Sequence, residues 1–472
     1  MFLLPTNPDD RRTALVEPSS GTRLSYRELA SHVRAAASDL AADRKQLIFL
    51  LGSREISCVI AYLAAIEAGH ALVWIDPALS AASFERLLTT YQPEMVVCGV
   101  GRAAHRHISE GHLEDRHSTL GRVWHSRTPA SAHPLHPDLA CLLATSGSTG
   151  SSKLVRLRRT SLTANARAIV RALDVSADDV AITSLPIAHA FGLSVLDSHL
   201  IAGGTVVLDE SGTLQADFWR VMRDERVTSL AGVPLTFELL RRLLPARMLP
   251  ETVRMLIQAG GRLDLDHVAF FHDLMAARGG DFRVMYGQTE ATARISVWPR
   301  NVPPDKMASV GRVIPGGAIR IDAATGEICF RGANVMMGYA ESRADLSRPG
   351  DVDELATGDL GCLDDDGFLF LTGRTKRIAK LAGCRVNLDD VEAIFDGMSA
   401  AAVEVAGRLH VFVEAPRGAN LDDAARRLRQ TLALDPALMR VSGIEVLPRS
   451  SAGKVLYAEL EHGAPSVDTR RR

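Results

Sequence analysis

The sequence lacks paired cysteines, an excess of charge of either sign and long apolar runs. Its six cysteines are scattered without a Cys-x-x-Cys pair, which excludes the usual zinc and disulfide frameworks and favours a reducing compartment. The formal net charge is only −2 at pH 7, so neither nucleic acid nor an anionic membrane is expected as a partner. The apolar stretch at residues 63–75 is interrupted by Glu67 and His70, and no stretch reaches the length of a membrane span. The N-terminus has no basic region before Pro5, unlike a secretory signal, so we expect a soluble, cytoplasmic protein.

The length and the periodicity of the chain predict an α/β protein with more than one domain. The chain has 472 residues, of which 46% are hydrophobic, enough for two or three domains. Apolar strands alternate with helical stretches over residues 24–100 and 160–285, which predicts parallel βαβ layers. Short β-rich pieces between Gly-rich turns then predict a small barrel-like subdomain at about residues 310–372. The expected division is a large N-terminal domain over residues 1–375, which includes this subdomain, and a small mobile α+β C-terminal domain over residues 376–472.

A histidine-rich segment interrupts the alternation at residues 101–137. Serine, arginine and proline separate its histidines, and only His112 and His117 approach the spacing of a ligand pair on one helix face, as a poor match. We therefore expect a solvated connector here and no metal site. The seven histidines are His105, His107, His112, His117, His125, His133 and His136.

The strongest indication of a ligand site is the stretch ATSGSTGSSK at residues 144–153. It follows a strand-like apolar segment at residues 139–143, and glycines and hydroxyl residues fill most of it. Glycines let backbone N–H groups approach an anion closely, while hydroxyls and the ammonium group of Lys153 add donors, so the phosphates of a nucleotide are the expected ligand. Composition alone also permits a flexible surface loop. A Walker A loop is disfavoured, because two serines separate Gly150 from Lys153.

Four further motifs follow this loop along the chain. They are YGQTE at residues 286–290, TGD at 357–359, GRTK at 373–376 and PRSSAGK at 448–454. With these motifs in this order, the chain resembles the acyl-adenylating (AMP-forming) superfamily of acyl- and aryl-CoA synthetases, nonribosomal adenylation domains and luciferase. The resemblance extends from about residue 24 to residue 454.

The resemblance implies an ATP-dependent ligation in two steps. A small carboxylic acid attacks the α-phosphorus of ATP and expels pyrophosphate, and a thiol then attacks the acyl-AMP and expels AMP. Charge develops on the phosphates during the first step, so cations and hydrogen-bond donors are needed there. The implied cofactors are ATP and Mg²⁺, with coenzyme A or a phosphopantetheine thiol as co-substrate. Because no carrier domain follows Lys454, we expect the thiol to arrive in trans, as CoA or on an acyl carrier protein.

The resemblance also implies roles for individual residues. Lys454 would bridge the attacking carboxylate and the α-phosphate, the Thr289 hydroxyl would contact the α-phosphate, and Glu290 would bind Mg²⁺. Lys376 occupies the hinge position about which the C-terminal domain turns, and Gly383 belongs to the thiol tunnel. Implied nucleotide contacts, which include adenine at Tyr286 and ribose at Asp359 and Arg374, are Thr145, Ser146, Gly147, Ser148, Thr149, Gly150, Lys153, Gly260, Gly261, Tyr286, Gly287, Asp359 and Arg374. Ser152 stands where the family usually has proline, so we expect a more mobile phosphate loop.

The stretch PIAHAFG at residues 186–192 matches the segment that lines the acyl pocket in the family. Amino-acid-activating members carry an aspartate here that pairs with the substrate ammonium, whereas this chain has His189 followed by Ala190. A buried ammonium without a counter-ion is costly, so α-amino acids are disfavoured. The implied pocket residues are His189, Ala190, Phe191, Gly192, Gly232 and Met285.

The function expected from the sequence is that of an acyl- or aryl-CoA synthetase. One alternative is a stand-alone adenylation enzyme that loads a separate carrier protein. Another, of a different class, is a nucleotide-binding protein without turnover, which the presence of Lys454, Glu290 and Asp359 disfavours. The sequence does not distinguish one carboxylic acid from another.

Overall fold

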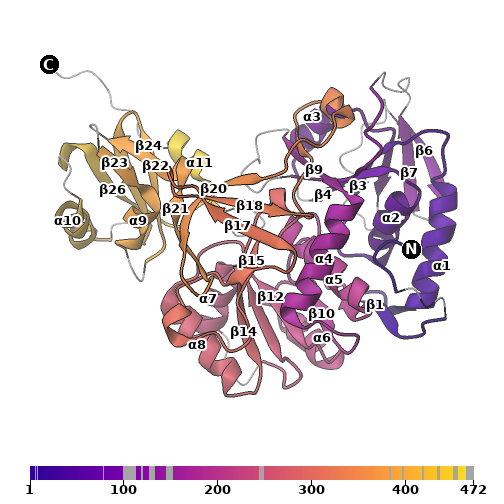
Figure 1. Ribbon diagram of the computed structural model, residues 1–472, viewed down its shortest axis with the longest axis horizontal. Coiled ribbons are helices and arrows are strands. Elements are labelled where there is room, and N and C mark those ends of the chain that lie inside the picture. The colour runs from indigo at the N-terminus through magenta and orange to yellow at the C-terminus, as the bar shows by residue number, and fades with distance from the viewer. Residues whose placement is uncertain are drawn as a thin grey trace. The chain divides into compact units, whose positions relative to one another are not determined.

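The computed structural model (Figure 1) describes most of the chain. The chain divides into two compact units. One comprises Met1–Ile319, Phe330–Leu355 and Asp364–Leu369, and the other comprises Arg320–Cys329, Ala356–Leu363 and Phe370–Arg472. The described residues are 1–5, 7, 9–77, 79–98, 113–118, 121–126, 133–144, 153–243, 249–381, 384–395, 398–416, 419–432, 436–449 and 455–463.

A nine-stranded sheet forms one layer of the first unit. Its strand order is β16-β15-β14-β13-β12-β10-β11-β1-β2, and the central neighbours from β14 to β1 are parallel. The parallel part carries the βαβ alternation that the sequence predicts. The strands are β1 (Thr13–Glu17), β2 (Thr22–Ser25), β10 (Val180–Ile182), β11 (Thr205–Val207), β12 (Ser229–Gly232), β13 (Met255–Gln258), β14 (Asp281–Tyr286), β15 (Ser296–Val297) and β16 (Arg312–Val313).

An eight-stranded sheet forms the second large layer of the same unit. Its order is β19-β9-β8-β4-β3-β5-β7-β6. Strands β3 and β4 are parallel and every residue of both is buried, as their unbroken apolar sequences predict for strands covered on both faces. The strands are β3 (Leu47–Leu51), β4 (Ala71–Ile75), β5 (Met95–Cys98), β6 (Leu113–Ser118), β7 (Gly121–Ser126), β8 (Leu139–Ala144), β9 (Leu154–Arg158) and β19 (Gly338–Ala340).

The edge of this sheet corrects the prediction of a connector over residues 101–137. Strands β6 and β7 pair antiparallel as a hairpin, and β7 pairs in turn with β5. His117 and His125 lie in these strands, whereas His105, His107 and His112 are outside the described residues.

Helices pack against both sheets and against one another. Helix α4 contacts β8 and β9 of the eight-stranded sheet, α5 contacts β10 and β11 of the nine-stranded sheet, and α4 and α5 contact each other (Figure 1). The two sheets are therefore joined through a helical layer. The helices of this unit are α1 (Tyr26–Asp39), α2 (Ile56–Glu67), α3 (Ala81–Tyr91), α4 (Arg159–Leu173), α5 (Ala190–Ala202), α6 (Ala216–Asp224), α7 (Pro234–Leu243), α8 (Leu265–Ala276), and the 3₁₀ helices η3 (Thr289–Ala291), η4 (Pro304–Lys306) and η5 (Arg343–Ser347).

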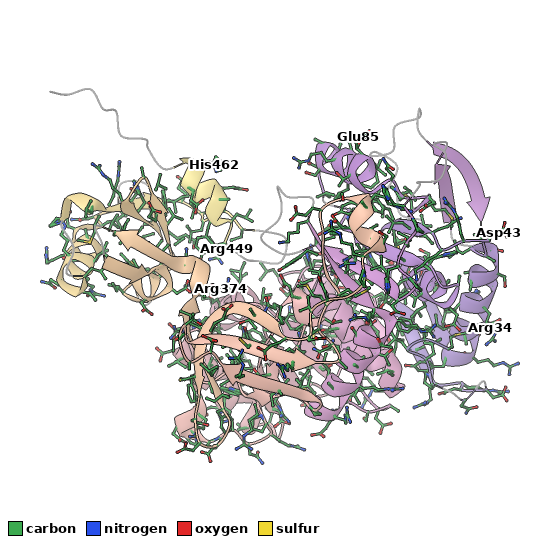
Figure 2. All side chains as sticks on the ribbon, turned by 45° about the horizontal axis from the view of Figure 1, so that its top comes forward. Arg34, Asp43, Glu85, Arg374, Arg449 and His462 are labelled. Carbon is green, nitrogen blue, oxygen red and sulfur yellow. The ribbon has the colours of Figure 1, made fainter. Side chains whose placement is uncertain are left out.

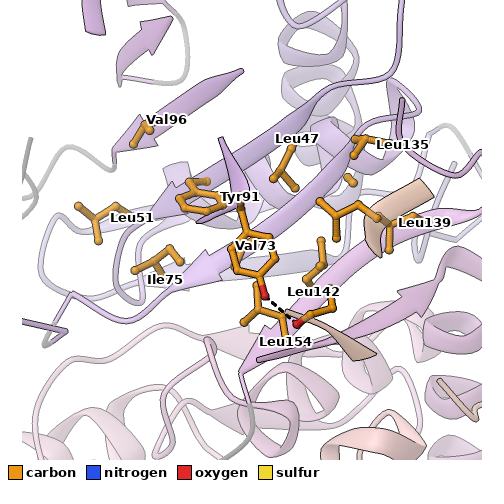
Figure 3. Close-up of a cluster of buried hydrophobic side chains, with 14 of the residues drawn as sticks. Leu47, Leu51, Val73, Ile75, Tyr91, Val96, Leu135, Leu139, Leu142 and Leu154 are labelled. Carbon is orange, nitrogen blue, oxygen red and sulfur yellow. Dashed lines mark hydrogen bonds between the residues drawn. The ribbon is translucent and has the colours of Figure 1, made fainter. Parts of the chain in front are cut away.

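A buried apolar cluster holds the eight-stranded sheet together (Figure 3). It brings side chains of β3 and β4 together with Leu142 of β8, Leu154 of β9 and Tyr91 of α3. The Tyr91 hydroxyl donates a hydrogen bond of 2.7 Å to the carbonyl of Ala340 in β19, so its one polar group is satisfied inside the cluster. The strands that flank the glycine-rich loop are therefore anchored in a packed core.

The later part of the chain is rich in short strands. A four-stranded sheet has the order β17-β18-β20-β21, a hairpin joins β22 to β23, and a three-stranded sheet has the order β24-β25-β26. The α/β fold class with these smaller β-rich pieces confirms the prediction. The elements are β17 (Gly317–Ile321), β18 (Glu327–Gly332), β20 (Leu355–Leu363), β21 (Leu369–Arg374), η6 (Thr375–Arg377), β22 (Ile378–Leu381), β23 (Cys384–Asn387), α9 (Leu388–Ala393), β24 (Ala400–Val405), β25 (Arg408–Glu414), α10 (Asp422–Thr431), η7 (Pro436–Leu438), β26 (Met439–Ile444) and α11 (Tyr457–Gly463).

Within the described residues, none of the helices combines the length and the apolarity that a membrane crossing requires.

Candidate active site

The carboxyl ends of three neighbouring parallel strands collect several of the predicted site residues. Gly232 is the last residue of β12, Gly260 lies two residues beyond β13, and Tyr286 is the last residue of β14. In a parallel sheet these ends lie along one edge, where ligands of α/β proteins commonly bind. Gly260 has a φ of +89°, a backbone conformation that favours glycine. The predicted adenine and acyl segments thus start from the same edge of the nine-stranded sheet.

A tight turn carries the YGQTE motif past the end of β14. At Gly287 an added Cβ would lie 1.9 Å from the carbonyl oxygen of Ala293, so a side chain there would force the backbone apart. The turn closes through hydrogen bonds from the Ile295 amide to the Tyr286 carbonyl and from the Met336 amide to the Glu290 carbonyl, both 2.9 Å. Thr289 begins η3, so Thr289 and Glu290 are held directly beyond the sheet edge.

Glu290, Tyr339 and Lys153 form a side-chain cluster beside this turn. The Tyr339 hydroxyl donates a hydrogen bond of 2.8 Å to Glu290 Oε1, and Lys153 Nζ lies 3.5 Å from the centroid of the Tyr339 ring. Burial, and then the nearby Glu290 charge, raise the pKa of Tyr339, so this hydroxyl stays protonated at neutral pH. Tyr339 belongs to β19, which pairs with β9 immediately after Lys153. The structure therefore joins the end of the glycine-rich loop to the YGQTE motif through one tyrosine.

Sequence reasoning missed Tyr339. The only signal was a Gly-Tyr pair that closes the apolar run VMM at residues 335–337. Nothing local to that run connects it to Glu290, which lies 49 residues earlier in the chain.

The glycine-rich loop connects two antiparallel strands. It leaves β8 after Ala144 and enters β9 at Leu154, and these strands pair directly. In a Walker A loop a helix begins at the last residues of the loop, whereas here a strand intervenes before α4. The connection therefore supports the prediction that this is no P-loop. Several predicted residues lie outside the described residues, namely Thr145, Ser146, Gly147, Ser148, Thr149, Gly150, Gly383 and Lys454.

The environment of Glu290 fits a magnesium ligand. Oε1 accepts the hydrogen bond from Tyr339, while Oε2 accepts none from the residues that the structure describes. A half-buried carboxylate with an available oxygen suits a hard cation that takes its other ligands from phosphate and water. Elsewhere in the described residues, no three His, Cys, Asp or Glu side chains come together as a metal-binding group.

The predicted acyl segment opens helix α5. His189 is the N-cap residue of this helix, and Ala190, Phe191 and Gly192 form its first turn. An added Cβ at Gly192 would lie 2.2 Å from the Pro186 carbonyl oxygen, which fixes this position as glycine. His189 Nε2 lies 3.8 Å from a carboxylate oxygen of Asp76, just beyond β4, which sequence reasoning did not single out.

A second residue that the sequence analysis missed, Arg294, links two predicted acyl-pocket residues. Its guanidinium carbon lies 4.4 Å from the centroid of the Phe191 ring, and its Nε donates to Met285 Sδ at 3.2 Å. Nη2 donates to Ser194 Oγ at 3.2 Å and Nη1 to the Ala293 carbonyl at 3.1 Å. Arg294 is only 3% exposed, so Phe191 and Met285 meet around a buried cation.

The TGD and GRTK motifs lie in the second unit. Asp359 is in β20 and is nearly buried, and Arg374, labelled in Figure 2, ends β21. Arg374 Nε lies 2.9 Å from Asp359 Oδ1, so the two predicted ribose-binding residues form an ion pair. The turn is fixed at Gly358, where φ is +75° and the amide donates to Glu327 Oε1 at 2.8 Å. Lys376 follows in the 3₁₀ helix η6.

Comparison with known proteins identifies the family. Residues 6–340 match the model of the AMP-binding enzyme family. The 3-[(3aS,4S,7aS)-7a-methyl-1,5-dioxo-octahydro-1H-inden-4-yl]propanoyl:CoA ligase of Rhodococcus jostii (strain RHA1) is 29% identical over 68% of this chain and 64% of its own length, so the match spans under two thirds of that relative. The 4-coumarate–CoA ligase-like 9 of Arabidopsis thaliana is 28% identical over 95% of this chain and 86% of its own length.

A solved structure has the same fold over nearly the whole chain. It is ATP-bound MatB from Rhodopseudomonas palustris, which is 25% identical and covers 98% of this chain and 97% of its own, with a TM-score of 0.78. The family match, the ligase relatives and this structure confirm the relationship that the sequence motifs predict. The chain belongs to the AMP-binding enzyme family, whose members include acid–CoA ligases that form AMP.

Proposed function

We propose that this protein activates a small carboxylic acid with ATP as an acyl adenylate, releases pyrophosphate, and then transfers the acyl group to the thiol of coenzyme A. The family match and two CoA-ligase relatives support this proposal. The observation that carries it is the Glu290–Tyr339–Lys153 cluster, which joins a phosphate-type loop to an acidic motif at the carboxyl edge of a parallel sheet.

In the first step the substrate carboxylate forms a bond to the α-phosphorus, and the bond from that phosphorus to the pyrophosphate oxygen breaks. Negative charge accumulates on the phosphate oxygens, so positioned cations lower the barrier. Lys153 supplies such a cation from the end of the glycine-rich loop, and Lys454 supplies a second that bridges carboxylate and α-phosphate. The Thr289 hydroxyl donates to an α-phosphate oxygen.

Glu290 would hold Mg²⁺ through the oxygen that Tyr339 does not engage. The ion would neutralise charge on the phosphate chain when it is bound. Tyr339 fixes the carboxylate by donating to its other oxygen.

Each unit contributes residues that we propose to contact the nucleoside. Tyr286 packs on adenine where Gly260, Gly261 and Gly287 let the backbone approach closely. Asp359 accepts hydrogen bonds from the ribose hydroxyls, and its ion pair with Arg374 orients the carboxylate.

The second step places the thiol where Lys454 acts in the first. We propose that residues 376–472 turn about Lys376 as a domain relative to residues 1–375, which exposes the acyl adenylate to a thiol that enters along Gly383. The sulfur forms a bond to the acyl carbon, the bond from that carbon to the phosphate oxygen breaks, and AMP leaves.

Acid-dependent exchange of labelled pyrophosphate into ATP tests the first step. We expect Lys454→Ala to lose most of this exchange, about 100-fold or more, and to keep thioester formation from a supplied acyl adenylate. Equal loss of both half-reactions would contradict the role of Lys454. No exchange with any acid, in the wild-type protein with ATP and Mg²⁺, would refute the proposed function.

The acceptor is tested by adding free CoA to the wild-type protein with its adenylate. A thioester of CoA supports the proposal. Transfer only to an added phosphopantetheinyl carrier protein would replace it with the carrier-loading alternative.

A further inference from the structure

Arg294 is a buried cation that the proposed chemistry does not use. The side chain has five N–H donors, and the described residues accept three hydrogen bonds from it, one at each nitrogen. One of these acceptors is a thioether sulfur, which accepts only weakly. One N–H on each terminal nitrogen therefore has no acceptor among the described residues.

Within the part of the chain that the structure describes, the charge of Arg294 is not offset by a carboxylate. Among the described residues, no Asp or Glu forms an ion pair with it, and its aromatic contact with Phe191 is a weaker substitute. Burial lowers the pKa of Arg294 to about 9, which leaves the group protonated at neutral pH. A buried guanidinium without an anionic partner is energetically unfavourable. A bound ligand that carries an anion would remove this cost.

The position of Arg294 indicates where an anion would come from. Its contacts Phe191 and Met285 are two of the residues proposed to line the acyl pocket. Ser194 holds the guanidinium from the same helix, because its hydroxyl donates to the Phe191 carbonyl at 2.7 Å and accepts from Arg294. The cation is thus fixed in orientation by pocket residues.

From this arrangement we propose that the acid activated by this protein carries a second carboxylate, which binds Arg294 while the first carboxylate reacts with ATP. The inference rests on the proposed function and adds the class of its substrate, dicarboxylic acids. The two terminal N–H groups without an acceptor match the two oxygens of one carboxylate. A substrate with an apolar end would leave the guanidinium buried and uncompensated.

The test compares matched acids that differ in one terminal carboxylate. Pentanoate against glutarate, hexanoate against adipate, and benzoate against terephthalate are measured by kcat/KM for pyrophosphate exchange. We expect the wild-type protein to favour the diacid by about 100-fold in at least one pair, because a buried site built for hydrogen bonding rejects a partner that lacks the group. Arg294→Met should reverse this ratio, and Arg294→Lys, which keeps the charge but loses the fork, should fall between them.

Arg300→Met is the matched control. Arg300 lies six residues after Arg294, is exposed and pairs with Asp281. Its substitution should leave the ratio of kcat/KM for diacid over monoacid unchanged. Wild-type preference for the monoacid in all three pairs, or an unchanged ratio in Arg294→Met, would overturn the inference. If Arg294→Met does not fold, the wild-type ratios and Arg294→Lys decide the question.

A binding measurement separates this inference from the proposed function. Calorimetric titration of the wild-type protein and Arg294→Lys with the three diacids, in the presence of ATP, reports the contact without turnover. Binding that weakens in Arg294→Lys without any exchange would uphold the anion site and refute the ligase. Exchange with monoacids alone would uphold the ligase and refute the anion site.

Discussion

Two buried arginines of the same unit have opposite surroundings. Arg343, in η5, is 5% exposed and donates to both carboxylate oxygens of Glu94, at 2.6 and 3.2 Å. Arg294 is 3% exposed, stacks on Phe191 and forms no ion pair with a described carboxylate. Both side chains are buried, and the main difference between them is that only Arg343 has a carboxylate partner among the described residues.

The comparison shows how a structural cation can be told from one kept for a ligand. Arg343 also donates to the carbonyls of Tyr91 and Gln92, so it ties η5 to the end of α3 through both terminal nitrogens and a carboxylate. Arg294 is held by a hydroxyl, a thioether and a neighbouring carbonyl, which fix its direction without cancelling its charge. A bound anion would therefore stabilise the charge of Arg294, which the described carboxylates do not offset.

Breaking the balanced pair should have the largest effect. We expect Arg343→Met to lower the free energy of unfolding by about 3 kcal/mol or more, because Glu94 loses its buried partner and keeps only the partly exposed Arg44. Urea unfolding of the first unit, followed by tryptophan fluorescence, measures the loss. The control is Arg348→Met, since Arg348 pairs with Asp345 but is 68% exposed. Equal effects of the two substitutions would show that Arg343 is not a structural anchor.

The same substitution at Arg294 should not lower the free energy of unfolding. Arg294→Met exchanges an uncompensated buried cation for an apolar chain in a site lined by Phe191 and Met285. We expect the protein to be unchanged or more stable by about 1 kcal/mol in the same urea experiment, without substrate. A loss as large as that of Arg343→Met would mean that Arg294 is a structural residue and would remove the contrast.

The sequence predicts the strands of this site better than its contacts. The apolar run at residues 255–258 coincides with β13, and the run at 139–143 falls within β8, because strands buried on both faces are continuous apolar segments between turns. The short polar strands β6 and β7 were missed, since His- and Arg-containing segments show no clear alternation.

The contacts that give the site its chemistry join distant segments. Arg294 reaches Ser194 across 100 residues and Tyr339 reaches Glu290 across 49, separations at which no sequence period operates. Motifs identified Glu290 and Lys153 through resemblance to a family, whereas Arg294 and Tyr339 stand outside those motifs. Only the fold brings them to the sheet edge.

Lys153 extends the comparison to a third cation and gives the smallest effect. Like Arg294 it lies over an aromatic ring, but the hydroxyl of that ring donates to Glu290. Tyr339→Phe keeps the ring beneath the ammonium and removes only the hydroxyl, so Glu290 loses its fixed orientation. We expect the Mg²⁺ concentration for half-maximal pyrophosphate exchange to rise about fivefold, with little change at saturating Mg²⁺, since one partly exposed hydrogen bond is worth about 1 kcal/mol. Tyr91→Phe is the control, because its hydroxyl donates to the neighbouring Ala340 carbonyl and should affect stability without altering Mg²⁺ dependence. An unchanged Mg²⁺ requirement in Tyr339→Phe would contradict the assignment of Glu290 as a Mg²⁺ ligand. Tyr339 would then act only as the aromatic ring that Lys153 contacts.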